Sequence, residues 1–259
     1  MIPHRMARVA KENPGLKETP KFKRELKLQP ASEARLTNTQ WVRKHAHSYM
    51  QTGSLVFAGG SSVTDFRLRV AQSHLRRDLL PSLWSHVALV GGGKRDSWEL
   101  KEVSLSPPGG FQDVAGQNAC QKSRVAAYDN PQLWPNLAVV RFPVGGTQVL
   151  DAIEQVRMSR GTIDLSALVI PWLAFVWGAG SSPNPLLQEK GIPSAVFAET
   201  VMGIVGIDLT PGISSQASCP EAIWQACKWW HLFYKETSEK KEAPRGVYVV
   251  RQPSAYVPD

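Results

Sequence analysis

Apolar residues along this 259-residue chain recur with two different periods, which predicts both strands and helices. Runs of β-favouring residues predict strands over 53–57, 84–90, 98–105, 137–142 and 247–250. Spacings of three and four residues predict helices over 37–50, 63–80, 147–159, 165–177, 194–205 and 218–234. The segment 106–135 is rich in Pro, Gly, Asn and Gln, and we expect it to be a loop.

We make a further prediction for each of two of these helices. In 63–80, Phe66, Val70 and Leu75 follow helical spacing, and we expect this segment to cover the mouth of a site. The segment 165–177 is the most apolar part of the chain, which favours a buried helix, with an apolar wall for an acyl chain as the alternative. Its apolar run contains Pro171 and is too short to span a bilayer.

The runs 84–90 and 98–105 flank a triple glycine and a charged turn, which predicts a hairpin. Side chains alternate along each strand, and the expected register can place Glu102 beside His86. A shift of one residue would present Glu99 in its place. Either carboxylate could orient the imidazole of His86, and the alternative is that His86 is only structural.

The helix expected after Gly191-Ile192-Pro193 places Ser194 at its amino end, as the N-cap. Unpaired backbone N–H groups and the helix dipole favour an anion there. Such a position lowers the pKa of a thiol and supplies a donor to an oxyanion. Residue 194 is therefore either a nucleophile or a serine that only caps the helix.

Charge divides the chain unevenly. The net charge is +8, and residues 1–50 hold 11 Lys and Arg against 4 Asp and Glu. We therefore expect a basic, partly extended N-terminal arm over 1–50 and a nearly neutral domain over 51–259. The arm could meet nucleic acid or an anionic membrane surface, or it could simply be solvated.

The three cysteines, Cys120, Cys219 and Cys227, have no metal-ligand spacing and leave an odd count, so we expect no disulfide framework. Cys219 also stands at the start of an expected helix and is a rival nucleophile, although Pro220 removes an N–H there. The first residues lack the apolar core of a signal peptide, so we expect synthesis in the cytoplasm.

The order of these segments along the chain resembles the order found in a known family. Gly53-Ser54-Leu55-Val56-Phe57 comes first, then the strands of His86 and Glu102, and last the helix at 194–198. This order resembles the circularly permuted NlpC/P60 branch of the papain-like hydrolases, the YiiX-like group related to lecithin:retinol acyltransferase. There a "GDLVF"-like strand precedes the catalytic His, and a "CSELV" helix start supplies the Cys. The resemblance covers roughly residues 50 to 235.

The resemblance implies an α+β, papain-like permuted fold, with an antiparallel sheet packed against helices that include the nucleophile helix. It implies a thiol hydrolase in which position 194 attacks, His86 is base and then acid, and Glu102 fixes the imidazole. It requires no metal or organic cofactor. The implied substrate is an amide in a peptidoglycan stem or related peptide, with a lipid ester or thioester hydrolase or acyltransferase as the alternative.

Ser194 departs from the family, since its Cys is absent, and the family's "YD" segment reads Thr162-Ile163-Asp164 without the tyrosine. A hydroxyl is far less acidic than a thiol, so a site built for Cys would leave Ser almost unreactive. We favour an engineered Cys→Ser replacement over a natural serine hydrolase or a catalytically inactive binding module with a basic arm. A bacterial effector or toxin, delivered by a secretion system and paired with an immunity or delivery protein, fits an inactivated nucleophile.

Overall fold

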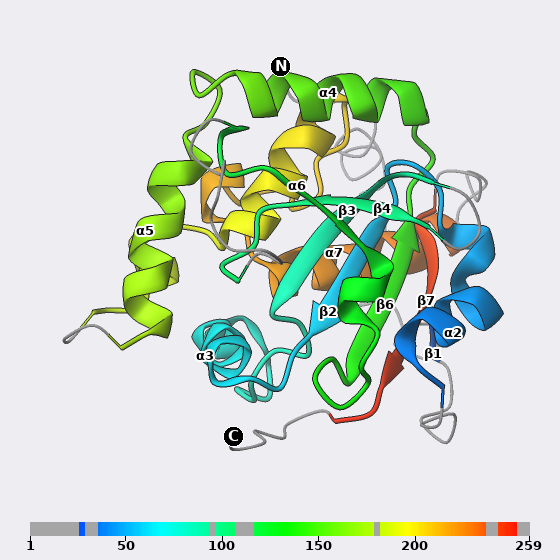
Figure 1. Ribbon diagram of the computed structural model, residues 1–259, viewed down its shortest axis with the longest axis horizontal. Coiled ribbons are helices and arrows are strands. Elements are labelled where there is room, and N and C mark those ends of the chain that lie inside the picture. The colour runs from blue at the N-terminus through cyan, green and yellow to red at the C-terminus, as the bar shows by residue number, and fades with distance from the viewer. Residues whose placement is uncertain are drawn as a thin grey trace.

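The computed structural model describes residues 26–28, 36–93, 97–106, 117–178, 182–236 and 243–252. A seven-stranded sheet with the strand order β1-β7-β6-β2-β3-β4-β5 forms its centre (Figure 1). Neighbouring strands from β7 to β5 are antiparallel, and β1 pairs in parallel with β7 at one edge. With helices on both faces of this sheet, the fold class is α+β, as expected.

The strands are β1 Lys27–Leu28, β2 Leu55–Gly59, β3 His86–Gly92, β4 Glu99–Glu102, β5 Gln121–Arg124, β6 Asn136–Arg141 and β7 Arg245–Val250. The α-helices are α2 Asn38–Trp41, α3 Val63–Ala71, α4 Gly146–Met158, α5 Leu165–Val176, α6 Pro193–Ile204 and α7 Pro220–Glu236. All five strands expected from the sequence are therefore present, with shifted ends. No helix within the described ranges is long and apolar enough to cross a membrane.

The expectation of a plain loop over 106–135 was wrong for part of that segment. It contains β5 and the 3₁₀ helix Val125–Tyr128, while 107–116 lies outside the described residues. Strand β5 reads Gln-Lys-Ser-Arg and is held at the sheet edge by its ladder with β4. A polar edge strand has no hydrophobic alternation by which the sequence could reveal it.

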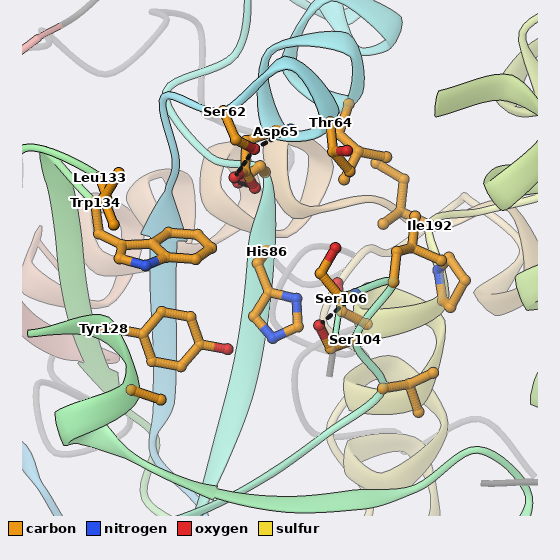
Figure 2. A pocket seen from close by; sticks show the side chains of 17 residues that line it. Ser62, Thr64, Asp65, His86, Ser104, Ser106, Tyr128, Leu133, Trp134 and Ile192 are labelled. Carbon is orange, nitrogen blue, oxygen red and sulfur yellow. Dashed lines mark hydrogen bonds between the residues drawn. The ribbon is translucent and has the colours of Figure 1, made fainter. Parts of the chain in front are cut away.

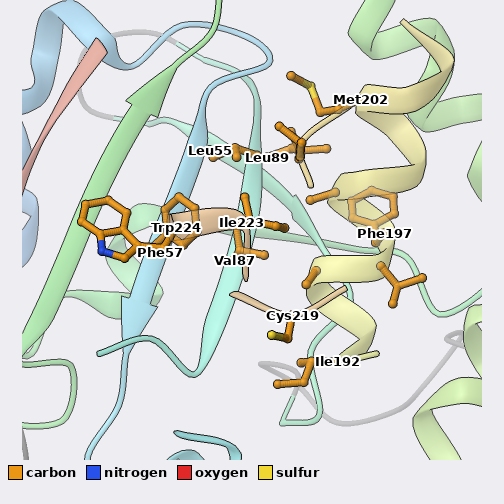
Figure 3. Close-up of a cluster of buried hydrophobic side chains, with 14 of the residues drawn as sticks. Leu55, Phe57, Val87, Leu89, Ile192, Phe197, Met202, Cys219, Ile223 and Trp224 are labelled. Atoms are coloured by element: carbon orange, nitrogen blue, oxygen red, sulfur yellow. The ribbon is translucent and has the colours of Figure 1, made fainter. Parts of the chain in front are cut away.

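Alternation along the strands gives the sheet two differently covered faces. On one face, Phe57 pairs with Val87 and both pack in a core that includes side chains of α6 and α7. Figure 3 shows this core, in which Phe197 of α6 and Trp224 of α7 lie over the strands. On the other face, Val56 and its neighbours pack in a second core.

The second core is covered by the last part of the segment that was expected to be a basic arm. Thr37 caps α2 in a reciprocal capping box with Gln40. Trp41, Val42 and Ala46 are fully buried against this face of the sheet. The end of the range 1–50 thus belongs to the packed structure, whereas residues 1–25 lie outside the described residues.

The apolar spacing expected for 63–80 did not identify the buried side of α3. Val70 and Leu75 are exposed, whereas Leu68 and Arg69 are buried. The helix ends at Ala71 and Leu75 belongs to a separate 3₁₀ turn, so the spacing does not continue along one helix. The Arg69 guanidinium is buried because it donates to the main-chain oxygens of Ser82 and Gly60.

Trp224 lies at the centre of the first core, edge-on to Phe57, Trp84 and Tyr248. Because it is almost fully buried, we expect Trp224→Ala to lower the free energy of unfolding by about 3–5 kcal/mol. Urea unfolding followed by far-UV circular dichroism measures this loss. Trp229→Ala, on the same helix but 37% exposed, is the matched control and should cost about 1 kcal/mol. Equal losses would show that the Trp224 cluster is not central to stability.

Candidate active site

A cavity of about 390 Å³ brings together the two halves of the expected site. His86, the first residue of β3, lines it from the sheet, and Ser194, in the first turn of α6, lines it from the helix. In Figure 2, the Tyr128 hydroxyl points toward the His86 ring from one side, while Ser104 and Ile192 lie on the other. Two groups more than 100 residues apart in sequence therefore share one cavity.

Glu102, rather than Glu99, is the carboxylate beside His86. The register pairs Val90 with Leu100, so the period of two puts His86 and Glu102 on the same face. The Glu102 Oε2 lies 2.9 Å from His86 Nε2. Glu99 turns away, with its side chain 40% exposed, and pairs with Lys101 at 2.7 Å.

Glu102 is fully buried and yet favours its charged form. Burial raises the pKa of Glu102, but the hydrogen bond from His86, and its positive charge whenever the ring is protonated, outweigh burial with help from Tyr128, so this pKa lies below its ordinary value. Tyr128 donates its hydroxyl to the same Oε2 at 2.7 Å. Burial and the nearby Glu102 charge raise the pKa of Tyr128 well above its usual range, so this hydroxyl keeps its proton.

These contacts fix the tautomer of the neutral His86 ring. An ionised carboxylate can only accept, so Nε2 must carry the proton that bonds Glu102. Nδ1 then holds a lone pair, and it makes no hydrogen bond within the described residues. The ring is therefore arranged as a proton acceptor at Nδ1, with an anion behind it to stabilise the imidazolium that would form.

The start of α6 differs from the sequence expectation by two residues. Ile192, not Ser194, is the N-cap, and Pro193 and Ser194 are the first helical residues. Proline is favoured at the first helical position because its missing N–H costs nothing there. Within the described residues, no acceptor bonds the Ser194 backbone N–H, whereas those of Ala195 and Val196 bond Ile192.

The Ser194 side chain is buried and its hydroxyl has no hydrogen-bond partner within the described residues. An unpaired buried hydroxyl costs about 1–3 kcal/mol, so serine is a poor fit to this position in the ground state. A thiol is a weak hydrogen-bonding group that tolerates an apolar setting. The environment of residue 194 therefore suits a sulfur atom better than a hydroxyl.

Two residues near His86 were missed by the sequence reasoning. Tyr128 sits in the 3₁₀ helix that was expected to be loop, so nothing in its spacing indicated a role. Asp65 also lines the cavity, and it accepts the hydroxyls of Ser62 at 2.6 Å and Ser85 at 2.7 Å. Burial raises the pKa of Asp65, so it adds a second, more proton-retentive carboxyl to the cavity. The Ser-x-x-Asp spacing of a helix start was its available signal.

The rival nucleophile does not reach this cavity. Cys219 is fully buried in the first core, and burial raises the pKa of its thiol to about 12. Cys120 and Cys227 are also buried and free, with thiol pKa values raised by burial. Helix α5 contributes no residue to the cavity lining, which leaves its apolar face outside this site.

Comparison with known proteins identifies no relative for this chain. No protein-family model, no curated protein and no solved structure matches it. No group of three or more His, Cys, Asp and Glu side chains in the described ranges could hold a metal ion.

A second buried carboxylate, Glu199, anchors α6 to the chain that follows it. Its oxygens accept the backbone N–H groups of Leu209 and Thr210 and the hydroxyls of Thr210 and Ser218. Burial, together with the charge of Asp208, raises the pKa of Glu199 to about 7. The position of α6, and with it residue 194, therefore depends on a group that changes charge near neutral pH.

This pKa makes stability depend on pH. The folded protein holds the Glu199 proton up to about pH 7, whereas the unfolded chain releases it near the ordinary value of 4.5. The free energy of unfolding should thus fall as pH rises across this interval, by about 3 kcal/mol. We expect Glu199→Gln to reduce the fall in urea midpoint between about pH 5 and about pH 8. Glu154→Gln, exposed on α4, should leave it unchanged, and an undiminished fall in Glu199→Gln would contradict the assignment.

Proposed function

We propose that this protein has the site of an acyl-transfer hydrolase of the permuted NlpC/P60, papain-like type, built for a thiol at position 194 and acting on an amide bond. The observation that carries the proposal is the shared cavity. It joins a helix-terminal position with an unbonded N–H to a histidine whose other ring nitrogen bonds a buried, ionised carboxylate. These are the nucleophile, base and orienting group that acyl transfer requires.

In this mechanism, His86 Nδ1 takes the proton of the nucleophile at 194, which attacks the substrate carbonyl carbon. The carbonyl oxygen gains negative charge, and the Ser194 backbone N–H at the positive end of α6 stabilises it. The imidazolium then gives its proton to the leaving amine, and the C–N bond breaks. Water, deprotonated by the same ring, hydrolyses the acyl-enzyme and restores the nucleophile.

An amide substrate is proposed because its leaving amine cannot depart without a proton. Glu102 stabilises the imidazolium that delivers this proton, and Tyr128 keeps Glu102 in place through the shared Oε2. An ester or thioester leaves more readily and depends less on such an acid. The strength of the His86–Glu102 pair therefore favours amide cleavage over ester cleavage.

A site in which His86 and Glu102 keep their contacts fits the replacement of a single nucleophile, Cys by Ser, better than the gradual loss of a catalytic site. Glu102 and His86 make the contacts that a base needs, and of these three site residues only the nucleophile departs from the family pattern. The unpaired hydroxyl of Ser194 supports a position shaped for sulfur. In the serine form we expect the cavity to bind substrate and to turn it over very slowly.

The decisive test restores the thiol. Ser194→Cys should create a thiol of low pKa that iodoacetamide labels near neutral pH, because the helix dipole and His86 stabilise the thiolate. Adding His86→Ala should slow labelling at least about tenfold. Intact-protein mass spectrometry measures the rate, and the unchanged protein gives the background, since Cys120, Cys219 and Cys227 lie outside the cavity lining and burial raises the pKa of their thiols.

Leu133→Cys is the matched control because Leu133 lines the same cavity but is exposed and lies away from α6. Its labelling should follow an ordinary thiol pKa and should not respond to His86→Ala. Equal labelling of the Leu133→Cys and Ser194→Cys variants at every pH would show that residue 194 is not an activated nucleophile.

The reaction itself separates the alternatives. The Ser194→Cys variant should hydrolyse peptide amides, with peptidoglycan stem peptides as the first substrates, and adding Glu102→Gln should lower kcat about a hundredfold or more. Preferential cleavage of phospholipids or acyl-thioesters would assign the ester chemistry instead. Activity confined to the serine form would indicate a natural serine hydrolase. Binding without turnover in both forms would indicate a binding module.

A further inference from the structure

The proposed mechanism leaves one carboxyl of the active-site cavity without a role, that of Asp65. Asp65 lies in the first turn of α3, three residues after the N-cap Ser62. Its Oδ2 accepts the Ser62 hydroxyl at 2.6 Å, and its Oδ1 accepts the Ser85 hydroxyl at 2.7 Å. Figure 2 shows the Asp65 side chain between α3 and the start of β3, where it lines the same cavity as His86. An acidic group therefore stands in the cavity wall, outside the catalytic pair.

Helix capping does not account for this carboxyl. In a capping box, the acid at this position bonds the backbone N–H of the N-cap residue. Here the Asp65 carboxyl bonds the hydroxyls of Ser62 and Ser85 instead. Ser85 also accepts the Gly60 N–H at 3.1 Å, and a Cβ at Gly60 would overlap the Asp65 carboxyl. These contacts hold the carboxyl in one place at the cavity wall.

The charge of Asp65 is only partly offset by its neighbours. Burial raises the pKa of Asp65, although its hydroxyl partners, the Arg69 charge and a protonated His86 act in the opposite direction. The Arg69 guanidinium donates to the main-chain oxygens of Ser82 and Gly60, and among the described residues Asp65 forms no ion pair. The described residues that line the cavity include no Lys or Arg. A cation that enters the cavity would therefore meet a carboxylate that lacks a direct counter-charge.

We propose that Asp65 binds a primary ammonium group of the substrate, so that the enzyme selects amides with a free amine close to the scissile bond. This assignment, which rests on the proposed function, narrows the substrate class of the same cavity. An ionised carboxylate has about four acceptor sites, and the two hydroxyls occupy two of them. An ammonium group at the remaining sites makes charge-assisted hydrogen bonds and offsets the burial of Asp65. Since one cavity of about 390 Å³ also holds Ser194 and His86, the amine belongs to the same residue as the scissile amide or to a neighbouring one.

The alternative is that Asp65 acts only through His86. A carboxylate near the ring favours the imidazolium, and this effect would be the same for every substrate. An ammonium site instead changes the preference between substrates with and without the amine. The informative quantity is therefore a ratio between two peptides on one protein preparation, because a misfolded fraction of a variant leaves that ratio unchanged.

Binding to the serine form measures this ratio without turnover. The probe is a lysine-containing peptidoglycan stem peptide, with its amino groups either free or acetylated. Isothermal titration of the unchanged protein should show at least about tenfold tighter binding of the free-amine peptide. Asp65→Asn keeps the shape of the side chain and should reduce this preference to about twofold or less. Glu99→Gln is the matched control and should retain the full preference, because Glu99 pairs with Lys101 and does not line the cavity.

The Ser194→Cys variant extends the ratio to catalysis. Its kcat/KM should favour the free-amine peptide at least about tenfold, and adding Asp65→Asn should lower kcat/KM for that peptide alone. Hydrolysis of both peptides at similar kcat/KM, with no preference in binding, would overturn the ammonium site and leave the proposed hydrolase standing.

Binding and turnover together separate the two proposals. An Asp65-dependent amine preference in the serine form, without hydrolysis by the Ser194→Cys variant, would support the ammonium site and contradict the hydrolase. Equal losses for both peptides in Asp65→Asn would overturn the ammonium site and assign Asp65 an effect through His86. Failure of the unchanged protein to bind the free-amine peptide more tightly than the acetylated one would overturn it as well.

Discussion

A fully buried carboxylate, Glu102, is the interaction on which the candidate site depends. A charge in the interior is tolerated only when neighbouring groups satisfy it, and His86 and Tyr128 both bond its Oε2. That requirement ties three segments together: β3, β4 and the 3₁₀ helix that follows β5. Removing Glu102 would leave a buried tyrosine hydroxyl unpaired, so chemistry and local stability are linked at this point.

The hairpin and its facing were predictable because sheet geometry allows little freedom. A period of two, with an apolar row to bury, sets which side chains share a face. With Val90 opposite Leu100, Glu102 faces the same side as His86 and Glu99 faces the other. The helix carrying residue 194 was predictable for a similar reason, since its apolar stripe is continuous from Phe197 to Val201.

The contributions of Tyr128 and Asp65 could not be read in the same way. Tyr128 lies in the 3₁₀ helix directly after β5, so its position depends on that polar edge strand. Strand β5 is held by backbone pairing with β4, which requires no apolar alternation in the sequence. From the sequence, Asp65 is predicted only to belong to the start of a helix. Its place beside the cavity depends on the hydrogen bond from Ser85, the residue directly before β3. The two-residue error at Ser194 arose because Pro193 suits the first turn of the helix.

The lone hydroxyl of Ser194 has a consequence for how the protein can be used. Because no described residue bonds that oxygen, exchanging it for sulfur changes no contact on which the packing of α6 depends. The two forms should share one architecture and differ only in reactivity. If residue 194 acts as proposed, the serine form is a substrate trap: crosslinking or affinity capture with it would retain uncleaved target molecules long enough to be identified by mass spectrometry.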